Sequence, residues 1–314
     1  MNPFVNESLR ALEQGDGKEV RLGENSDPNH RPLRVIAFLA AHPLDSFSLT
    51  DIARELELSK GSAHRVLTAL TEAGFANRHP RHKTYSLGLA LVAIGQAALE
   101  RHPGIQVTRR EMARLAAELN VGCGAVAVAG QEYVLLAREG APWAQDGLML
   151  VGERRLLIPP IGICHMAWRK SDEVADYLAR GEAYLSPELR QRVEESLPVI
   201  RHRGYAMAAN GDGMRRLRAA SVLAGGVAPG LADMPAGSVI ADEYQLLDTA
   251  AAARGVNYIS APVFAADGSM CHEVVMSALP EGLSAAEIER FAARLCRAAD
   301  IVTAETRGRA PKPW

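Results

Sequence analysis

The sequence predicts an α+β fold in two parts, a small helical module followed by a larger body built on an antiparallel sheet. Three observations predict it: apolar residues recur at helical spacing three times between residues 32 and 73, a short segment with strand character follows, and the remainder alternates helical patterns with hairpins. The chain has 314 residues, of which 48% are hydrophobic and 23% charged. That length is sufficient for two domains, each with its own core.

Neither a membrane span nor a cysteine framework is expected. No apolar run reaches the roughly 18 residues that a membrane helix needs, and residues 1–10 lack the features of a signal peptide. The four cysteines are widely separated and show no metal-ligand spacing. We therefore expect a cytoplasmic protein with reduced thiols, no membrane partner, no metal site and no cofactor.

The net charge of −2 is distributed unevenly along the chain. Residues 29–88 contain eight Lys and Arg against five Asp and Glu, whereas the rest of the chain contains 27 against 32. A small basic module joined to a larger acidic body is typical of a nucleic-acid reader attached to a regulatory domain.

Turn-forming residues and changes of periodicity set the expected domain boundaries. They predict a flexible tail at 1–30, a helical module at 31–88, a linker helix at 89–103, the body at 104–307 and a second tail at 308–314.

Each of the three helices predicted in the module has a core-facing stripe and identifiable ends. The first lies between Pro32 and Pro43. Ser48 is an N-cap candidate for the second helix and Ser59 for the third, which stops at Gly74. Because only two residues separate the last core position of the second helix from the cap of the third, the pattern indicates a helix-turn-helix.

A basic hairpin is predicted to follow the third helix. Residues 75–87 have strand character on both sides of a polar, proline-containing turn. The turn contains no acid, and its charged or titratable residues are Arg78, His79, Arg81, His82 and Lys83. Three helices followed by such a hairpin predict a winged helix-turn-helix.

The body is expected to combine an antiparallel sheet with helices. Strands are predicted at 121–129, 132–139, 205–209, 257–264 and 270–278. Helices are predicted around 112–119 and at 163–179, 186–203 and 284–306. The stretch from Ala208 to Val256 is ambiguous.

At this point the sequence resembles the IclR family of bacterial transcription regulators over nearly its whole length. The resemblance is carried by LTDIARELELSKGSAHRVLTALTEAGF at 49–75, YSLGL at 85–89, IRHRGY at 200–205 and YISAPVFAADG at 258–268. It implies a winged helix-turn-helix, a linker helix and a GAF-like effector-binding domain, assembled as a homodimer or a dimer of dimers.

Two departures indicate a divergent branch of that family. Residues 158–168 read IPPIGICHMAW where the family usually has a Leu-His-Ala-Thr-Ala-type segment followed by Gly-Lys-Ala, so the floor of the effector pocket differs chemically. The family also passes quickly from its Gly-Tyr strand to its Ala-Pro-Val-Phe strand, whereas here residues 208–256 intervene.

The partner expected for the module is a double-stranded DNA operator. Arg65 is suited to donate two hydrogen bonds to a guanine edge, while Ser59 and Lys60 lie in the first turn of the third helix, where backbone donors meet phosphate. The alternative is a solvated helix face in a protein-binding winged helix. The expected DNA-contacting residues are Thr50, Ser59, Lys60, Gly61, Ser62, His64, Arg65, Thr68, Arg78, Arg81, His82 and Lys83.

The partner expected for the body is a small-molecule effector. If the family's arrangement holds, the start of a helix near Gly162 lies beside strands that carry serines, and apolar walls favour an aromatic or other organic acid. The expected effector-contacting residues are Met149, Ile161, Gly162, Ile163, Cys164, His165, Tyr258, Ser260 and Ser277.

Catalysis and metal binding are not predicted. The pairs Cys164-His165 and Cys271-His272 invite a metal or thiol-sensor interpretation, but adjacent strand residues face opposite ways, and two ligands make a poor site. No nucleophile elbow, carboxylate pair or phosphate loop is found. We therefore expect an effector-controlled regulator and no enzyme. The alternative is a ligand-binding or catalytic body fused to a winged helix, without effector-controlled operator binding.

Overall fold

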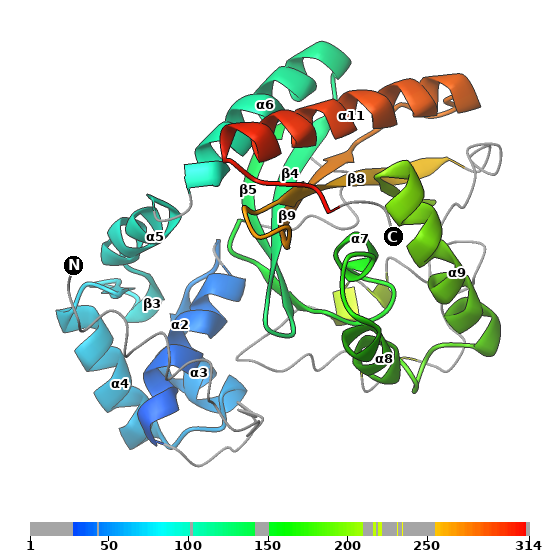
Figure 1. Cartoon of the computed structure of the whole chain (residues 1–314). Helices are drawn as coiled ribbons and strands as arrows, with labels where there is room; N and C mark the ends of the chain where they lie inside the picture. The colour runs from blue at the N-terminus through cyan, green and yellow to red at the C-terminus, as the bar shows by residue number, and fades with distance from the viewer. Residues whose placement is uncertain are drawn as a thin grey trace, which may run out of the picture.

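The computed structural model describes residues 28–42, 44–100, 103–141, 151–209, 216–217, 219–221, 231, 234 and 255–311. Figure 1 shows a small N-terminal module of helices, a connecting helix and a body in which helices cover a curved sheet. The predicted α+β class is confirmed. None of the helices in these ranges is long and apolar enough to cross a membrane.

The N-terminal module contains three helices and a three-stranded sheet. Its elements are η1 (Pro28–His30), α2 (Arg31–Ala41), β1 (Phe47–Ser48), α3 (Leu49–Glu55), α4 (Lys60–Glu72), β2 (Ala76–Arg78) and β3 (Thr84–Leu87). The three predicted helices and the hairpin are confirmed. The strand β1 was not expected, and it pairs antiparallel with β3 through Phe47 opposite Tyr85.

Local sequence signals set the ends of the module's helices. The Ser48 side chain accepts a hydrogen bond from the Asp51 amide while the Asp51 carboxylate accepts from the Ser48 amide, which is a capping box. Burial of apolar side chains from all three helices then closes a single core, whose central members are Val35, Leu39, Ile52, Leu67 and Leu70.

Two consecutive helices connect the module to the body. The first is α5 (Ala90–Glu100), which has no buried residue, and the second is α6 (Pro103–Leu119). The helix α6 packs on the sheet, whereas α5 reaches the core of the body only through Leu99 near its end.

The body is organised around six antiparallel strands in the order β6-β5-β4-β9-β8-β7. Their bounds are β4 Gly122–Ala129, β5 Glu132–Gly140, β6 Arg154–Leu156, β7 Ala206–Ala209, β8 Val256–Phe264 and β9 Met270–Ser277. The two predicted hairpins are confirmed as β4-β5 and β8-β9. The strand β9 pairs with both β4 and β8 and so joins the hairpins at the centre of the sheet.

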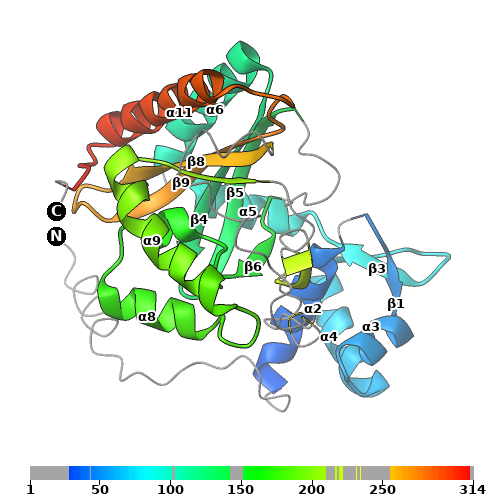
Figure 2. The same ribbon diagram turned by 90° about the vertical axis from the view of Figure 1, so that its right-hand side faces the viewer.

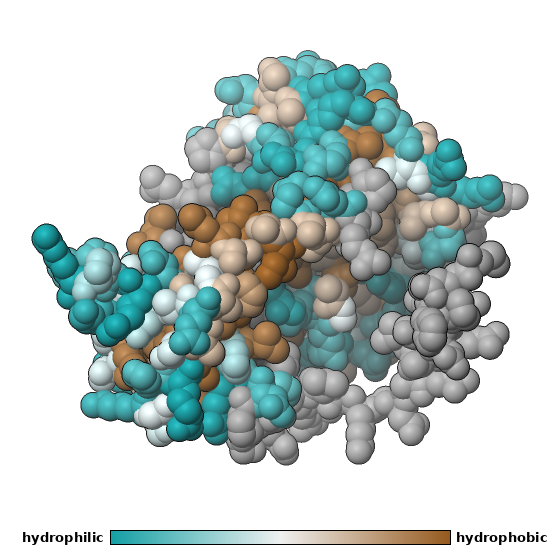
Figure 3. Space-filling view, turned by 90° about the vertical axis from the view of Figure 1, so that its left-hand side faces the viewer, coloured by the Kyte–Doolittle hydropathy of each residue, from teal (hydrophilic) through white to brown (hydrophobic). Residues whose placement is uncertain are grey.

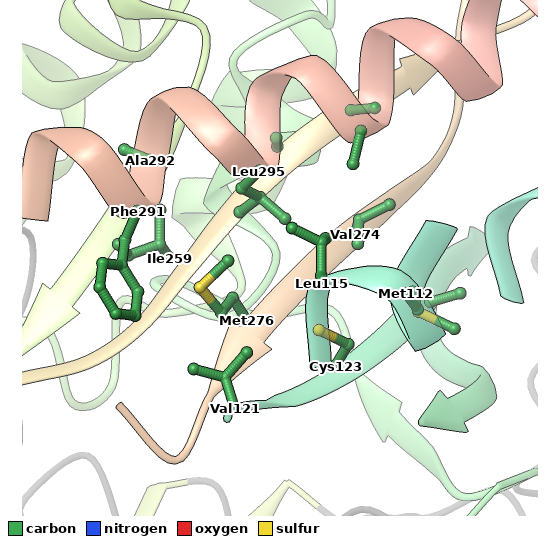
Figure 4. Close-up of a cluster of buried hydrophobic side chains, with 14 of the residues drawn as sticks. Met112, Leu115, Val121, Cys123, Ile259, Val274, Met276, Phe291, Ala292 and Leu295 are labelled. Atoms are coloured by element: carbon green, nitrogen blue, oxygen red, sulfur yellow. The ribbon is translucent and has the colours of Figure 1, made fainter. Parts of the chain in front are cut away.

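One face of the sheet is sealed by α6 and α11 (Ala285–Glu305), which lie side by side across it (Figure 1). Figure 4 shows the side chains that meet there: Met112 and Leu115 from α6, Val121 and Cys123 near the start of β4, Ile259, Val274 and Met276 from β8 and β9, and Phe291, Ala292 and Leu295 from α11. This is the larger apolar core of the body.

The opposite face is covered by α7 (Ile163–Met166), α8 (Ser171–Ala179) and α9 (Pro187–Arg203), as Figure 2 shows. The single helix predicted at 163–179 was wrong, because the structure divides it into α7 and α8. The physical reason is that the Glu173 carboxylate accepts a hydrogen bond from the Lys170 amide, so that a new helix begins after Lys170.

Candidate DNA interface and effector pocket

The helix α4 presents a polar face to solvent. Its N-cap is Ser59, whose Oγ accepts a hydrogen bond from the Ser62 amide at 3.2 Å. The expected DNA-contacting residues of this helix, Lys60, Gly61, His64, Arg65 and Thr68, are exposed, as is Thr50 on α3. The apolar stripe of α4 faces the opposite way, into the module's core.

Ser62 differs from the other candidates because its side chain is buried. Its Oγ accepts hydrogen bonds from Ser59 Oγ at 3.1 Å and from the Arg31 guanidinium at 3.2 Å. The Arg65 guanidinium lies 3.5 Å from the same oxygen. Ser62 therefore orients groups at the start of the helix, and Arg31, which the sequence did not single out, joins them. No local pattern signals Arg31, because it lies 31 residues from Ser62.

The hairpin between β2 and β3 carries exposed cations. Arg78, Arg81, His82 and Lys83 are all exposed. The His79 Nδ1 accepts hydrogen bonds from the amides of Arg81 and His82, at 3.2 and 3.1 Å, which fixes the shape of the turn. The hairpin is thus a short basic wing beside α4.

A second group of candidates meets on the face of the sheet opposite α6 and α11, which we call the inner face. Strand alternation and pairing place Tyr258 and Ser260 of β8 on this face opposite Ser277 and Val275 of β9. Cys164 of α7 lies over Ser260, and its Sγ is 3.8 Å from the Ser260 carbonyl oxygen. The structure therefore places Cys164 against Ser260, with Tyr258 and Ser277 paired on the same face.

A buried acid that the sequence did not single out completes this group. Glu273 of β9 is 2% exposed, and its Oε1 accepts a hydrogen bond from the Tyr133 hydroxyl. Its Oε2 is buried without a hydrogen-bond partner, and so is the Oγ of Ser260. A signal for Glu273 was present in the sequence. It is a lone charge in an apolar strand, and because it lies four residues before Ser277 it must be on the same face of that strand.

Burial governs the protonation of this group. It raises the pKa of the Glu273 carboxyl, although the nearby side chains of Tyr133, Ser260 and Cys164 act in the opposite direction. Burial also raises the pKa of the Cys164 thiol, and the nearby Glu273 carboxylate adds to that effect. Cys164 is therefore a neutral thiol rather than a reactive thiolate.

His165 lies in the wall of a different feature, a groove of about 340 Å³ beside the β4-β5 turn. Burial, with the adjacent Arg169 charge, lowers the pKa of His165 to about 3, so the ring is neutral. Its Nε2 accepts hydrogen bonds from Arg169 Nε at 3.0 Å and Nη2 at 2.7 Å. Arg180 and Asp176 also line this groove.

Of the remaining expected effector residues, the structure describes Ile161, Gly162 and Ile163. Ile161 and Ile163 are buried in the apolar cluster between α7, α8 and α9. Gly162 has a φ of 80°, in the left-handed region, and a Cβ there would collide with the Leu157 side chain, so glycine is required. Met149 lies outside the described residues, as does most of the stretch 208–256. Among the described residues no group of three His, Cys, Asp or Glu side chains could hold a metal ion.

Comparison with known proteins identifies the N-terminal module directly. Residues 30–80 match the family model of the IclR helix-turn-helix domain. The glycerol operon regulatory protein of Streptomyces griseus is 43% identical over 54 residues, which are 17% of this chain and only 21% of that relative. The HTH-type transcriptional regulator KdgR of Escherichia coli (strain K12) is 27% identical over 197 residues, covering 58% of this chain and 73% of that protein.

Solved structures show the same fold over most of the chain. An IclR transcriptional regulator from Alicyclobacillus acidocaldarius has a TM-score of 0.64 at 18% identity, covering 89% of this chain and 98% of that one. An IclR homolog from Microbacterium hydrocarbonoxydans, complexed with 4-hydroxybenzoate, has a TM-score of 0.61 at 18% identity. The match covers 90% of this chain and 99% of that one. The match of the helix-turn-helix module and the curated relatives confirm the resemblance to the IclR family, and the solved structures show that the fold is shared. Both curated relatives named above are regulators.

We predict that Glu273→Gln stabilises the ligand-free protein more at pH 8 than at pH 5. The raised pKa of Glu273 means that the folded state binds more protons than the unfolded state, so the stability contributed by this group falls as pH rises above its unfolded pKa. The glutamine lacks that dependence. The melting temperatures of both proteins at the two pH values test this, with exposed Glu281→Gln as the control. A larger stabilisation at pH 5 would contradict it.

Proposed function

We propose that this protein is a DNA-binding transcription regulator of the IclR type, whose operator affinity is controlled by a small-molecule effector. The observation that carries the proposal is α4, a capped helix with Arg65 and Lys60 exposed at its N-terminal half, next to a basic wing. In helix-turn-helix proteins the N-terminal residues of the second helix contact base edges in the major groove. As a regulator of operators it would work in the cytoplasm.

We propose a homodimer in which α5 is an interface with a second copy. Leu89 is 86% exposed, Val92 67% and Ile94 52%. Figure 3 shows apolar surface gathered in this region, between the module and the body. An apolar helix without buried residues is not stable against water, so a partner surface is needed, and a second copy supplies an identical one. Two modules would then read an inverted repeat. The same chemistry permits a dimer of dimers.

Effector control follows from the position of α6. This helix packs on the sheet that carries Ser260 and Glu273, and it follows α5 directly in the chain. A ligand that binds better to one arrangement of the α5 helices would shift the spacing of the two α4 helices. The factor by which the ligand changes operator affinity cannot exceed the ratio of its own affinities for the two arrangements.

Selection of duplexes from a randomised pool tests the proposal. The enriched sequences should contain an inverted repeat with half-sites about 10 base pairs apart, or a multiple of that distance. Failure to enrich any sequence would leave the body as a ligand-binding or catalytic domain without operator control. The selected duplex then serves in fluorescence anisotropy.

The first variant to test is Arg65→Ala. If Arg65 holds a guanine edge, its loss should cost about 1 to 3 kcal/mol on the selected duplex and remove the preference at one base pair per half-site. Anisotropy on the selected and on a scrambled duplex measures both effects. The exposed Arg297→Ala on α11 should change neither affinity. An equal loss on both duplexes would reduce Arg65 to a phosphate contact.

The wing is tested by its salt dependence. Replacing Arg81 and Lys83 together by alanine should make the slope of log K against log salt shallower by about 0.9 for each DNA phosphate that the wing no longer neutralises. The base preference should stay unchanged because interactions with the DNA backbone carry no sequence information. The measurement is anisotropy at several salt concentrations, and a slope equal to that of the wild type would remove the wing from the interface.

The α5 interface is tested by charge. The double variant Val92→Glu and Ile94→Glu places two buried charges between the copies and should dissociate the dimer. Arg297→Ala changes a charge on the exposed face of α11 and should leave the dimer intact. Sedimentation velocity measures both, with circular dichroism to confirm folding. A double variant that sediments as a dimer would place the interface elsewhere.

A further inference from the structure

We propose that the effector pocket selects a ligand bearing a protonated amine, which Glu273 and Ser260 bind, in place of the organic acid that the sequence suggested. The proposal rests on the proposed function, because it names the ligand class of the same site. It depends on three observations: two buried polar atoms without partners, no counter-charge beside them among the described residues, and aromatic surface on the same face.

The two atoms belong to neighbouring strands. Ser260 of β8 is 1% exposed and Glu273 of β9 is 2% exposed, and pairing places both on the inner face beneath α7. Glu273 Oε2 and Ser260 Oγ are both without a hydrogen-bond partner. Burying a polar atom without a partner costs about 1 to 3 kcal/mol, so two such atoms side by side need a reason. A bound donor that satisfies both atoms is such a reason.

The surroundings of Glu273 contain no compensating cation among the described residues. Its polar neighbours are Tyr133, Cys164 and Ser260, none of which carries a positive charge. Four guanidinium groups near this face bond other atoms. Arg155 binds Glu153, Arg169 binds His165 and Glu173, and Arg180 donates to the Leu157 carbonyl. The Nε of Arg203 donates to the Tyr205 carbonyl, and its guanidinium lies over the Tyr205 ring.

The chemistry of an amine fits this arrangement. An ammonium group carries three donors and no acceptor, so it can bond Glu273 Oε2 and Ser260 Oγ together, and bonds to a carboxylate are charge-assisted. A carboxylate ligand would instead place a second negative charge beside Glu273, and one of the two would have to bind a proton. Tyr133 and Tyr258 pack on the same face, and tyrosine rings attract cations.

The experiment uses two matched sets of probes with the full-length protein at pH 7. Benzylamine, benzyl alcohol and benzoate share one ring, and butylamine and butyrate share one chain. In at least one set the amine should raise the melting temperature and bind at least 10-fold more tightly than the acid, measured by calorimetry. Benzyl alcohol separates a charged donor from a neutral one, and we expect it to bind more weakly than benzylamine.

Variants assign the effect to this site. Glu273→Gln should weaken amine binding at least 10-fold, and Ser260→Ala should weaken it by a smaller factor. Glu173→Gln is the matched control, because Glu173 lines the separate groove beside the β4-β5 turn. This variant should bind the amine normally. If Glu273→Gln fails to fold, Ser260→Ala alone decides. Tighter binding of an acid, normal amine binding by both variants, or no binding of any amine would overturn the proposal.

Operator affinity separates this inference from the proposed function. Ligand-free wild type and Ser260→Ala should bind the selected duplex equally. If operator binding is intact while only acids bind, the ligand class is wrong and the regulator stands. If an amine binds through Glu273 and leaves operator affinity unchanged, the ligand class is right and effector control is wrong.

Discussion

The packing of α6 and α11 against one face of the six-stranded sheet is the constraint on which the rest of the body depends. A sheet has two faces, and once two long helices seal one of them with apolar side chains, alternation sends every second residue of β8 and β9 to the other. Ile259 and Met276 thus fill the core, while Ser260 and Ser277 lie on the inner face. Because α6 also follows the exposed α5 in the chain, the same packing connects the sheet to the module.

The helical module could be predicted from local sequence because its signals are local. Ser48 and Ser59 are caps that act within three residues, and the stripes of α3 and α4 have the helical period. The break between α7 and α8 was harder, because the hydrophobic period continues through Trp168 and only the Glu173 cap marks the new start. The two-residue β1 carries too little pattern to be recognised, and its pairing with β3 is a tertiary contact.

The candidate effector site was predictable in part. Ser260 and Cys164 followed from the family resemblance, whereas Glu273 was missed. Its even spacing from Ser277 indicates the face of the strand on which it lies, but only the tertiary packing decides whether that face is buried. His165 lies beside Cys164 in sequence, yet on a helix of one turn the two diverge, so that one meets the sheet and the other Arg169. The chemistry of the pocket therefore depends on tertiary placement more than on residue type.

Buried polar groups distinguish the inner face of the sheet from the face that α6 and α11 cover. The core between the sheet and α6 and α11 is formed by apolar side chains, whereas the inner face leaves a carboxylate oxygen and a hydroxyl unpaired at a cost in stability. Ser62 at the start of α4 is the contrasting case, because its buried hydroxyl is fully engaged by Ser59 and Arg31. The proposed ligand would complete the first arrangement, whereas the second orients the start of α4.

The most direct test of the account is thermodynamic linkage between pocket and operator. Calorimetry would measure the affinity of the protein for an effector with and without saturating operator duplex. If the two sites share one conformational equilibrium, operator must change effector affinity by the same factor by which effector changes operator affinity. Equal factors different from one are the predicted result. An effector affinity that operator leaves unchanged, for a protein that binds both, would contradict the account.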